Sequence, residues 1–392
     1  MCLILAAVVA CGGDSTGPGA RAASVAGFAG DSQQAPTGGA FQYPLSFITL
    51  GSNGQPIPDV HVSWSVTPAG AATFTPQTSV SDANGQVTTT VTAGPTPQQI
   101  TVHANVPGVT SPVVFKGLVL DPCTFVRAVS VGDTINGNLS AADCHYLGNA
   151  WFYDFYSLGL PAGQQSVRIA MQSTVFDTWI DLLRTDSTLV GFDDDVVLSQ
   201  NQNSQLDIIF PGDVYLIGAN SYDQGAVGNY TLQVQSRPAA MNGCREVWVL
   251  SGVSVSDSIT TSDCADTTAS LSRFDVARMY LMAGTVVTLT ERSGAIDPQL
   301  GLYRITGSTG DHYTHALVTS NDDSTTGNPT AFILDTIALS GPYDVVIGAN
   351  AAGQTGAYTF DVSVAPGPSA PVPVAGARSI RDRLGLLKRS KH

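Results

Sequence analysis

The sequence predicts an all-β protein built of several sandwich domains, and three observations carry this prediction. Val, Thr, Ser and Gly are abundant, and the chain contains 40 Gly and 22 Pro, a composition rich in strand and turn formers. Short segments such as Ser166–Met171 alternate between apolar and polar residues, which places one face in a core and the other in water. No long segment has helical periodicity. The length of 392 residues suits about three domains.

The chain begins with an apolar run at residues 2–10, which is too short for a membrane span of about 20 residues but fits a signal peptide. Small residues precede Cys11 in the sequence Val8-Val9-Ala10-Cys11. This arrangement resembles the lipobox of bacterial lipoproteins, which implies lipidation of Cys11, a signal segment at residues 1–11 and a flexible tether at residues 12–21. No Lys or Arg precedes the apolar run, unlike the usual signal. The alternative is an ordinary secretory signal cleaved near Ala10.

Residues 22–118 contain no Cys and form a separate module. The Asn-Gly pairs in this segment predict tight turns, and the alternation around Trp64 predicts a strand with Trp64 in the core. Three motifs occur in order: Gly30-Asp31-Ser32-Gln33, Gly54 to Trp64, and Asp82 to Val87. In this order they resemble bacterial Ig-like domains of the invasin/intimin type. The resemblance implies an Ig-like β-sandwich that acts as a spacer or adhesive module on a cell surface.

Residues 121–236 and 242–365 are two copies of one module. The matching segments are Leu160–Gly163 with Leu281–Gly284, Phe176–Arg184 with Ile296–Arg304, Tyr215–Asn220 with Val345–Asn350, and Gly228–Thr231 with Gly356–Thr359. The second copy has an insertion near residues 307–319. The order of these motifs resembles the bacterial pre-peptidase C-terminal domain, so the resemblance implies two tandem jelly-roll-like β-sandwiches. In that family the domain is usually an accessory that binds or stabilises, and some relatives bind calcium.

Four cysteines fall in the two copies as pairs with similar internal spacing: Cys123 and Cys144, then Cys244 and Cys264. No Cys-x-x-Cys occurs, which argues against a zinc or redox motif. In an oxidising compartment, paired cysteines at matching places in two copies predict two disulfides. The alternative is four buried free thiols.

Clustered carboxylates are the strongest candidates for a ligand site. The predicted metal-binding residues are Asp177, Asp193, Asp194 and Asp195 in the first copy, and Asp297, Asp322 and Asp323 in the second. Calcium prefers several hard oxygen ligands from loops, so these residues make calcium the candidate cofactor. The alternative is that Asp favours turns through bonds to its own backbone.

Motifs for catalysis are absent, so we expect no enzymatic activity. The sequence has no His-Glu-x-x-His, no Gly-x-Ser-x-Gly and no phosphate-binding Gly-rich loop. The one local His pair, at residues 311–315, is interpreted as part of a surface loop rather than a metal site. The net charge of −14 argues against a nucleic-acid-binding surface, which needs clustered Lys and Arg.

The end of the chain, residues 366–392, is Pro-rich and then basic. It is interpreted as a solubilising tail, with a short amphipathic helix as the alternative. The whole sequence predicts an exported, non-enzymatic envelope lipoprotein, held to the outer membrane or cell surface by lipid, with an extracellular protein or polysaccharide as ligand. The second hypothesis is an accessory component of a secreted peptidase system.

Overall fold

The computed structural model describes residues 20–145, 151–195, 202–241, 244–265, 273–309, 312–322 and 330–366. Every regular element in these residues is a strand, so the predicted all-β class is confirmed. No helix among them has the length and hydrophobicity needed to cross a membrane. Contacts divide the chain into two compact units, with the boundary between Phe125 and Val126.

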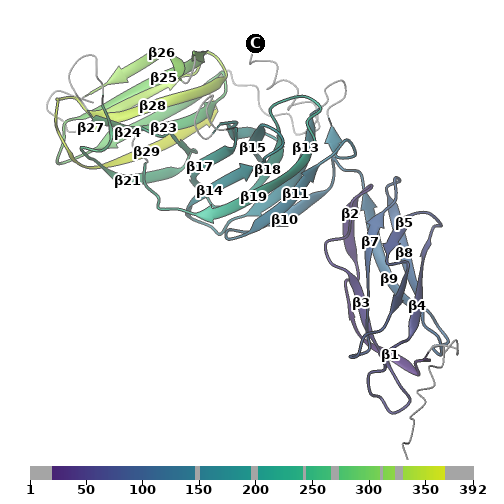
Figure 1. The fold of residues 1–392 in the computed structure, drawn as a ribbon. Helices are drawn as coiled ribbons and strands as arrows, with labels where there is room; N and C mark the ends of the chain where they lie inside the picture. The colour runs from purple at the N-terminus through teal and green to yellow at the C-terminus, as the bar shows by residue number, and fades with distance from the viewer. Residues whose placement is uncertain are drawn as a thin grey trace, which may run out of the picture. The chain divides into compact units, whose positions relative to one another are not determined.

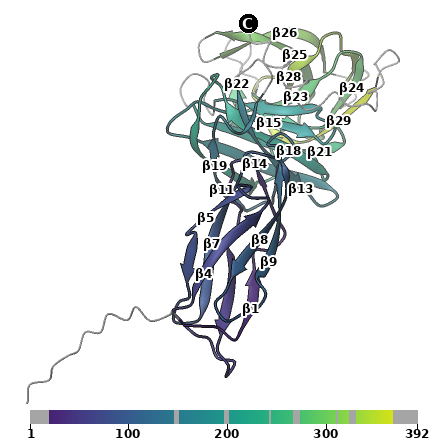
Figure 2. The same cartoon turned by 90° about the vertical axis from the view of Figure 1, so that its right-hand side faces the viewer.

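The N-terminal unit is a sandwich of two sheets with strand orders β1-β3-β7-β5 and β2-β9-β8-β4-β6 (Figures 1 and 2). Its strands are β1 (Ser24–Ala29), β2 (Gln33–Pro36), β3 (Leu45–Leu50), β4 (His61–Thr67), β5 (Ala72–Thr75), β6 (Thr78–Val80), β7 (Gln86–Ala93), β8 (Gln98–Asn105) and β9 (Val113–Leu120).

Alternation along β4 fixes which of its side chains enter the core. Val62 and Trp64 are buried while their neighbours are exposed, as the period of two requires. Trp64 packs against Phe47 and Phe115, with ring centroids 5.9 and 6.1 Å away. Its Nε1–H donates to Ser79 Oγ at 2.9 Å, which satisfies the buried indole donor. The predicted core position of Trp64 is confirmed.

The first strand changes sheets at Gly30. β1 pairs with β3 in one sheet, and β2 pairs in parallel with β9 in the other. Gly30 has a φ of 85°, and a Cβ there would lie 2.4 Å from the carbonyl oxygen of Pro44, so no larger residue fits. This switch leaves β1 and β9 facing each other across one side of the sandwich.

The C-terminal unit contains both repeat copies, and each copy is a sandwich of two sheets (Figure 1). In the first copy the sheet orders are β10-β13-β18-β15-β16, with β12 beside β13, and β11-β19-β14-β17. Its strands are β10 (Val126–Val129), β11 (Thr134–Leu139), β12 (Cys144–His145), β13 (Phe152–Gly159), β14 (Gln164–Gln172), β15 (Thr178–Arg184), β16 (Leu189–Asp193), β17 (Ser204–Pro211), β18 (Val214–Ser221) and β19 (Gly228–Ser236).

The second copy repeats this topology, with sheet orders β20-β23-β28-β25-β26, with β22 beside β23, and β21-β29-β24-β27. Its strands are β20 (Val247–Val249), β21 (Val253–Ile259), β22 (Cys264–Ala265), β23 (Arg273–Leu281), β24 (Thr285–Arg292), β25 (Pro298–Thr309), β26 (His312–Asn321), β27 (Thr330–Thr336), β28 (Gly341–Ala349) and β29 (Gly356–Pro366).

The two copies share one continuous sheet. β20 pairs in parallel with β17 of the first copy and with β23 of its own copy, which joins two sheets into a ten-stranded one. Side chains also exchange at this junction: Trp248 of β20 lies in the core of the first copy, and Ile209 of β17 lies in the core of the second. The two copies are therefore parts of one compact unit.

All four predicted cysteines are disulfide-bonded. The Cys244–Cys264 bond closes a loop across the start of the second copy, beside β22. Cys123 and Cys144 hold the matching positions of the first copy. The alternative of free thiols is therefore wrong for these residues.

Two details of the repeat differ from the sequence-based expectation. The insertion in the second copy is not a loop: it lengthens β25 and β26 into a long antiparallel hairpin.

The Ile-Gly-Ala-Asn motifs are also not equivalent in space. Arg184 and Arg304 hold matching positions, and they pair with Tyr215 and Tyr343, respectively. Tyr215 therefore corresponds in space to Tyr343, two residues before the position that the motif match gives. A shift of two residues keeps each side chain on the same face of the sheet, so the motif alone cannot distinguish the two alignments.

Candidate functional site

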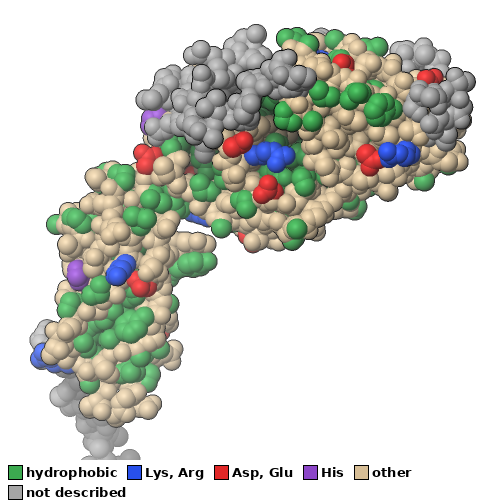
Figure 3. All heavy atoms as spheres, turned by 180° about the vertical axis from the view of Figure 1, so that it is seen from behind, with side chains coloured by type: hydrophobic (Ala, Val, Ile, Leu, Met, Phe, Trp, Pro, Cys, Tyr) green, Lys and Arg blue, Asp and Glu red, His purple; other side chains and the backbone are tan. Residues whose placement is uncertain are grey.

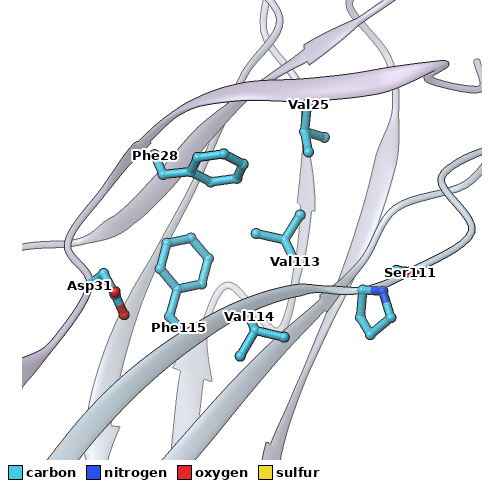
Figure 4. Close-up of a pocket in the computed structure, with 8 residues that line it drawn as sticks. Val25, Phe28, Asp31, Ser111, Val113, Val114 and Phe115 are labelled. Atoms are coloured by element: carbon cyan, nitrogen blue, oxygen red, sulfur yellow. The ribbon is translucent and has the colours of Figure 1, made fainter.

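An apolar groove lies on the N-terminal unit between β1 and β9 (Figure 4). Val25 and Phe28 line it from β1, and Val113 and Phe115 face them from β9. The groove has a volume of about 400 Å³. Phe28 is 56% exposed although its ring lies 6.4 Å from that of Phe115. A large aromatic side chain left open beside a hydrophobic core marks a contact surface.

The floor of this groove is an open sheet edge. β2 pairs only with residues 117–120 of β9, so residues 113–116 have no strand on this side within the described chain. Lys116 directs both backbone groups outward: its N–H donates to Asp31 Oδ1 at 2.7 Å, and its carbonyl accepts from the N–H of Ser32 at 2.9 Å. Backbone groups two residues apart point the same way, so the N–H and C=O of Val114 also face the groove. An added strand would hydrogen-bond to this edge.

Charged side chains are sparse on the face of the molecule seen in Figure 3, and hydrophobic side chains are spread over it. This agrees with a charged content of only 12%.

The predicted metal-binding residues of the first copy gather at one end of its sandwich, around Tyr222. The N–H of Tyr222 donates to the carbonyl of Asp177 at 2.9 Å. Burial raises the pKa of the Tyr222 hydroxyl, and the charges of Asp194, Asp177 and Asp195 raise it further. Asp177, Asp194 and Asp195 therefore lie close enough to the Tyr222 hydroxyl to act on it electrostatically.

Asp193 is bound to the backbone of a neighbouring strand. Its carboxylate accepts a hydrogen bond from the N–H of Gln205 at 2.6 Å. Burial raises the pKa of Asp193 well above its ordinary value, which the Gln205 bond only partly offsets.

In the second copy, Asn350 brings two predicted residues together. Its Nδ2 donates to Asp297 Oδ2 at 3.3 Å and to Asp322 Oδ2 at 3.2 Å. The side-chain amide therefore occupies the space between the two carboxylates. Asp323 lies outside the described residues, as does Cys11.

The described carboxylates do not by themselves form a calcium cage. Within the described parts of the chain, no three His, Cys, Asp or Glu side chains are arranged to hold a metal ion. Calcium needs six to eight oxygen ligands, so backbone or water oxygens would have to supply most of them. Calcium binding stays a prediction from the sequence.

Calorimetric titration of the full chain with calcium chloride tests this prediction. If the Asp177–Tyr222 end of the first copy binds calcium, wild type should release or absorb heat and gain in Tm, and the double variant Asp194→Asn, Asp195→Asn should do neither. Asp213→Asn, an exposed change in the β17–β18 turn, serves as the control. No heat and no gain in Tm for wild type would contradict the prediction.

A buried charge cluster lies where the long hairpin of the second copy covers β23 and β28. Arg278 donates two hydrogen bonds to Asp344, at 2.7 and 2.9 Å, and a third to Glu246 at 2.6 Å. Its guanidinium lies over the ring of Tyr313, 4.5 Å from the centroid. His315 Nε2 lies 2.8 Å from Asp344 Oδ2. The interpretation of the His pair, His312 and His315, as part of a surface loop is therefore wrong, because both residues lie on β26.

The pKa of Asp344 shows whether burial or the neighbouring donors decide the charge of this carboxyl group. Burial acts to raise this pKa, but the positive charge of Arg278 and the hydrogen bond from His315 lower it on balance. Asp344 is thus ionised and Arg278 is charged, which makes the group a satisfied structural ion pair.

Glu291, a carboxylic acid in the core of the second copy, was not predicted from the sequence. Its side chain is fully buried, and no donor lies at both the distance and the angle that a hydrogen bond to either Oε atom requires. Burial raises its pKa to about 9, and the charge of Asp275 adds to the shift. The first copy has Met171 at this position. Period-two alternation with Val287 and Leu289 is the signal that could have found it.

Residues 26–116 match the family model described as Bacterial Ig-like domain (group 1), which agrees with the module predicted at residues 22–118. The match and the disulfides indicate an extracellular or cell-envelope protein. No curated protein sequence shows a significant match to this chain.

Several solved structures resemble the chain at low identity. The pre-peptidase C-terminal domain of a Bacillus anthracis collagenase is 15% identical with a TM-score of 0.23, and the match covers 28% of this chain and 95% of that one. The D0-D1 domain of intimin is 14% identical with a TM-score of 0.22, covering 54% and 99%. InvD of Yersinia pseudotuberculosis is 12% identical with a TM-score of 0.18, covering 86% and 97%. Likeness at this level says nothing about what this chain binds.

Proposed function

We propose that this chain is a non-enzymatic cell-envelope protein whose Ig-like unit binds an extended segment of an extracellular protein. The observation that carries the proposal is the groove between β1 and β9, where apolar side chains lie beside an open sheet edge. The edge offers backbone hydrogen bonds, and Phe28, Val113 and their neighbours offer apolar contact. This combination favours a polypeptide over a polysaccharide, because β-strand addition uses both features.

Phe28→Asp should weaken this binding strongly. Retention of the full chain on a surface coated with gelatin, an extended polypeptide, is expected to fall by about tenfold or more, since burying a Phe side chain contributes about 1.5–3 kcal/mol. Retention on a cellulose surface should be absent for both proteins. Tyr43→Asp is the matched control, because Tyr43 is also an exposed aromatic of this unit (59%) but lies outside the groove.

Three results would contradict the groove as the binding site. Wild type could fail to bind gelatin, it could bind cellulose instead, or Phe28→Asp could bind gelatin as well as Tyr43→Asp does. Equal melting temperatures for the two variants would exclude unfolding as the cause of a loss.

Lipid attachment at Cys11 is the second part of the proposal, and it rests on the sequence Val8-Val9-Ala10-Cys11. Cells that express the full chain with a functional signal should incorporate labelled palmitate into it, and the protein should fractionate with membranes. Cys11→Ser should lose the label and leave the membrane fraction. Cys2→Ser is the control and should keep both. Labelling that persists in Cys11→Ser would show that the anchor lies elsewhere.

The second candidate function is that of an accessory component of a secreted peptidase system. It is favoured by the order of motifs shared between the two copies, Leu160–Gly163 through Gly228–Thr231 and their repeats. It predicts that the two-copy unit, rather than the groove of the Ig-like unit, retains the protein on an insoluble protein substrate. The gelatin experiment separates the two candidates, because binding that survives Phe28→Asp would point to the second.

A further inference from the structure

Three arginines gather on the outer face of the first copy, beside its sheet β11-β19-β14-β17 (Figure 1). Arg168 of β14 alternates with Val167 and Ile169, which lie in the core, so its side chain points outward. Arg237 and Arg245 belong to the segment that connects β19 to β20. The whole chain has only 17 Lys and Arg against 31 Asp and Glu, and six of the 17 belong to the C-terminal tail. Three arginines at one place therefore form the main basic cluster of this face.

The three guanidinium groups share one carboxylate. Arg168 donates to both oxygens of Asp207, at 2.6 and 2.8 Å, and Arg237 Nε lies 4.0 Å from the same group. Among the described residues, no other carboxylate lies within salt-bridge distance of the three arginines. Burial lowers the pKa of Arg237, although the charge of Asp207 acts to raise it. The charges of Arg168 and Arg245 lower this pKa further, and that of Asp257 offsets part of the effect.

Arg168 and Arg245 lie on either side of one amide and keep donors for a ligand. With its amide oriented toward these donors, Gln205 Oε1 accepts from Arg168 Nε at 3.0 Å and from Arg245 Nη2 at 3.2 Å. The Arg168 side chain is 37% exposed, and Arg245 is half-buried. A guanidinium has five N–H donors in a fixed fork that matches a carboxylate. The two groups are therefore placed to hold one carboxylate of a ligand between them.

The rest of this outer face is polar and uncharged. Apart from Arg168, the outward positions of β14, β19 and β11 carry no charged and no large apolar side chain. Gln235 lies beside Arg168 in the ladder, and Gln233 lies beside Thr134. The amide and hydroxyl side chains that point outward here include Gln172, Thr231, Gln233, Gln235, Thr134, Asn136 and Asn138.

This composition favours a polysaccharide over a protein as the partner. Protein interfaces depend on large aromatic and apolar anchors, which this face lacks. Amide and hydroxyl side chains both donate and accept hydrogen bonds, as the hydroxyl groups of a sugar require. A sugar that also carries a carboxylate matches both the polar strands and the arginines beside them.

The second copy shows that the fold does not require the ion pair of this cluster. In the matching ladders, Arg168 corresponds to Thr288, and its partner Asp207 corresponds to Leu334. The equivalent sheet of the second copy therefore forms with neither charge. Since a buried ion pair costs desolvation and can be replaced by uncharged residues, the pair in the first copy is available for a role in binding.

We propose that this face of the first copy binds an acidic polysaccharide, with a sugar carboxylate held between Arg168 and Arg245. The amide and hydroxyl side chains of β19 and β11 bond to the hydroxyl groups of neighbouring sugars. The site belongs to the C-terminal unit, so it is independent of the groove of the Ig-like unit and of the function proposed for that groove.

Equilibrium binding of the full chain to immobilised polygalacturonate tests this proposal. In 0.15 M salt the Debye length is about 8 Å, so distant acidic groups of the protein are screened from the site. Wild type should bind polygalacturonate and should bind neither amylose, a neutral polysaccharide, nor poly-glutamate, an acidic peptide. Arg245→Gln should weaken binding by about tenfold or more, because charge-assisted hydrogen bonds are lost.

Two further variants separate the site from net charge. Arg168→Thr combined with Asp207→Leu copies the residues of the second copy and leaves the net charge unchanged, yet it should also weaken binding. Arg21→Gln removes an exposed arginine of the N-terminal unit and should bind like wild type. Among the described residues Arg245 bonds only to Gln205, so Arg245→Gln still decides the case if the double variant does not fold.

Any of three results would overturn the proposal. Wild type could fail to bind polygalacturonate, or Arg245→Gln could bind it as tightly as Arg21→Gln does. Amylose or poly-glutamate could also bind as tightly as polygalacturonate, which would assign the face to a neutral polysaccharide or to an acidic peptide.

Discussion

Replacing Glu291 with Met should stabilise the C-terminal unit strongly at pH 8 and only slightly at pH 4. The carboxyl group is fully buried, and burial raises its pKa to about 9 although the backbone N–H groups of Gly348 and Gln299 act to lower it. Met171 holds this position in the first copy, so the thioether has a precedent in the equivalent core. At pH 8 the expected gain in the free energy of unfolding is on the order of 5 kcal/mol, from about 1.4 kcal/mol for each unit of pKa shift.

The direction of the pH dependence follows from this raised pKa. The folded unit holds the Glu291 proton up to about pH 9, whereas the unfolded chain releases it near the ordinary value of 4.5. The contribution to stability is therefore fully present below pH 4.5 and is lost as the pH rises toward 9. Burial also raises the pKa of Asp154 to about 7, with the Asp143 charge adding to the shift, so this group is expected to lose its contribution between about pH 4 and 7.

Thermal unfolding from pH 4 to 9 measures both effects. Glu291→Gln is the matched control, because it removes the titration but keeps a buried polar group; it should flatten the pH dependence with a smaller gain in stability than Met. A wild type whose stability is constant from pH 5 to 8, or a Met variant less stable than wild type at pH 8, would contradict the assignment.

Trp248→Ala should destabilise both repeat copies, although Trp248 belongs to the second. Its ring lies in the core of the first copy, while its strand β20 joins the shared sheet. Truncation of a buried Trp costs about 3–5 kcal/mol through lost burial and the cavity left behind. The wild-type unit should unfold in one calorimetric transition, and Trp248→Ala should separate it into two at lower temperatures.

The control for this experiment is Trp64→Ala, a change of the same size in the core of the N-terminal unit. It should lower the stability of that unit and leave the transition of the repeat copies where it is. Two separate transitions for the repeat copies in wild type would argue against the shared core.

Local patterns in the sequence predict much of this fold because the forces involved are local. Alternation places Val62 and Trp64 in a core, and matched spacing pairs Cys244 with Cys264. The junction between the copies could not be predicted in this way. β20 is only three residues long, and its role depends on which edges meet in space. A repeat in sequence does not say whether its copies fold as separate bodies.

The candidate sites, too, could be predicted from the sequence only in part. The charges of Asp177, Asp194 and Asp195 all act on Tyr222, yet Asp193 bonds to the backbone N–H of Gln205, and Asn350 separates Asp297 from Asp322. Spacing alone cannot give the direction of a side chain at a strand end. The groove beside Phe28 was not predicted either, since it arises where the first strand changes sheets and leaves an edge of β9 uncovered.

The ten-stranded sheet has a mechanical consequence. A protein fixed at its N-terminal end and pulled through its second copy must carry that load across β20. β20 bonds to β17 on one side and to β23 on the other, so separating the copies must break one of these two ladders. It must also withdraw the Trp248 and Ile209 side chains, each of which lies in the core of the other copy. The copies should therefore resist extension together, and release under force should be set by the rate at which this sheet opens.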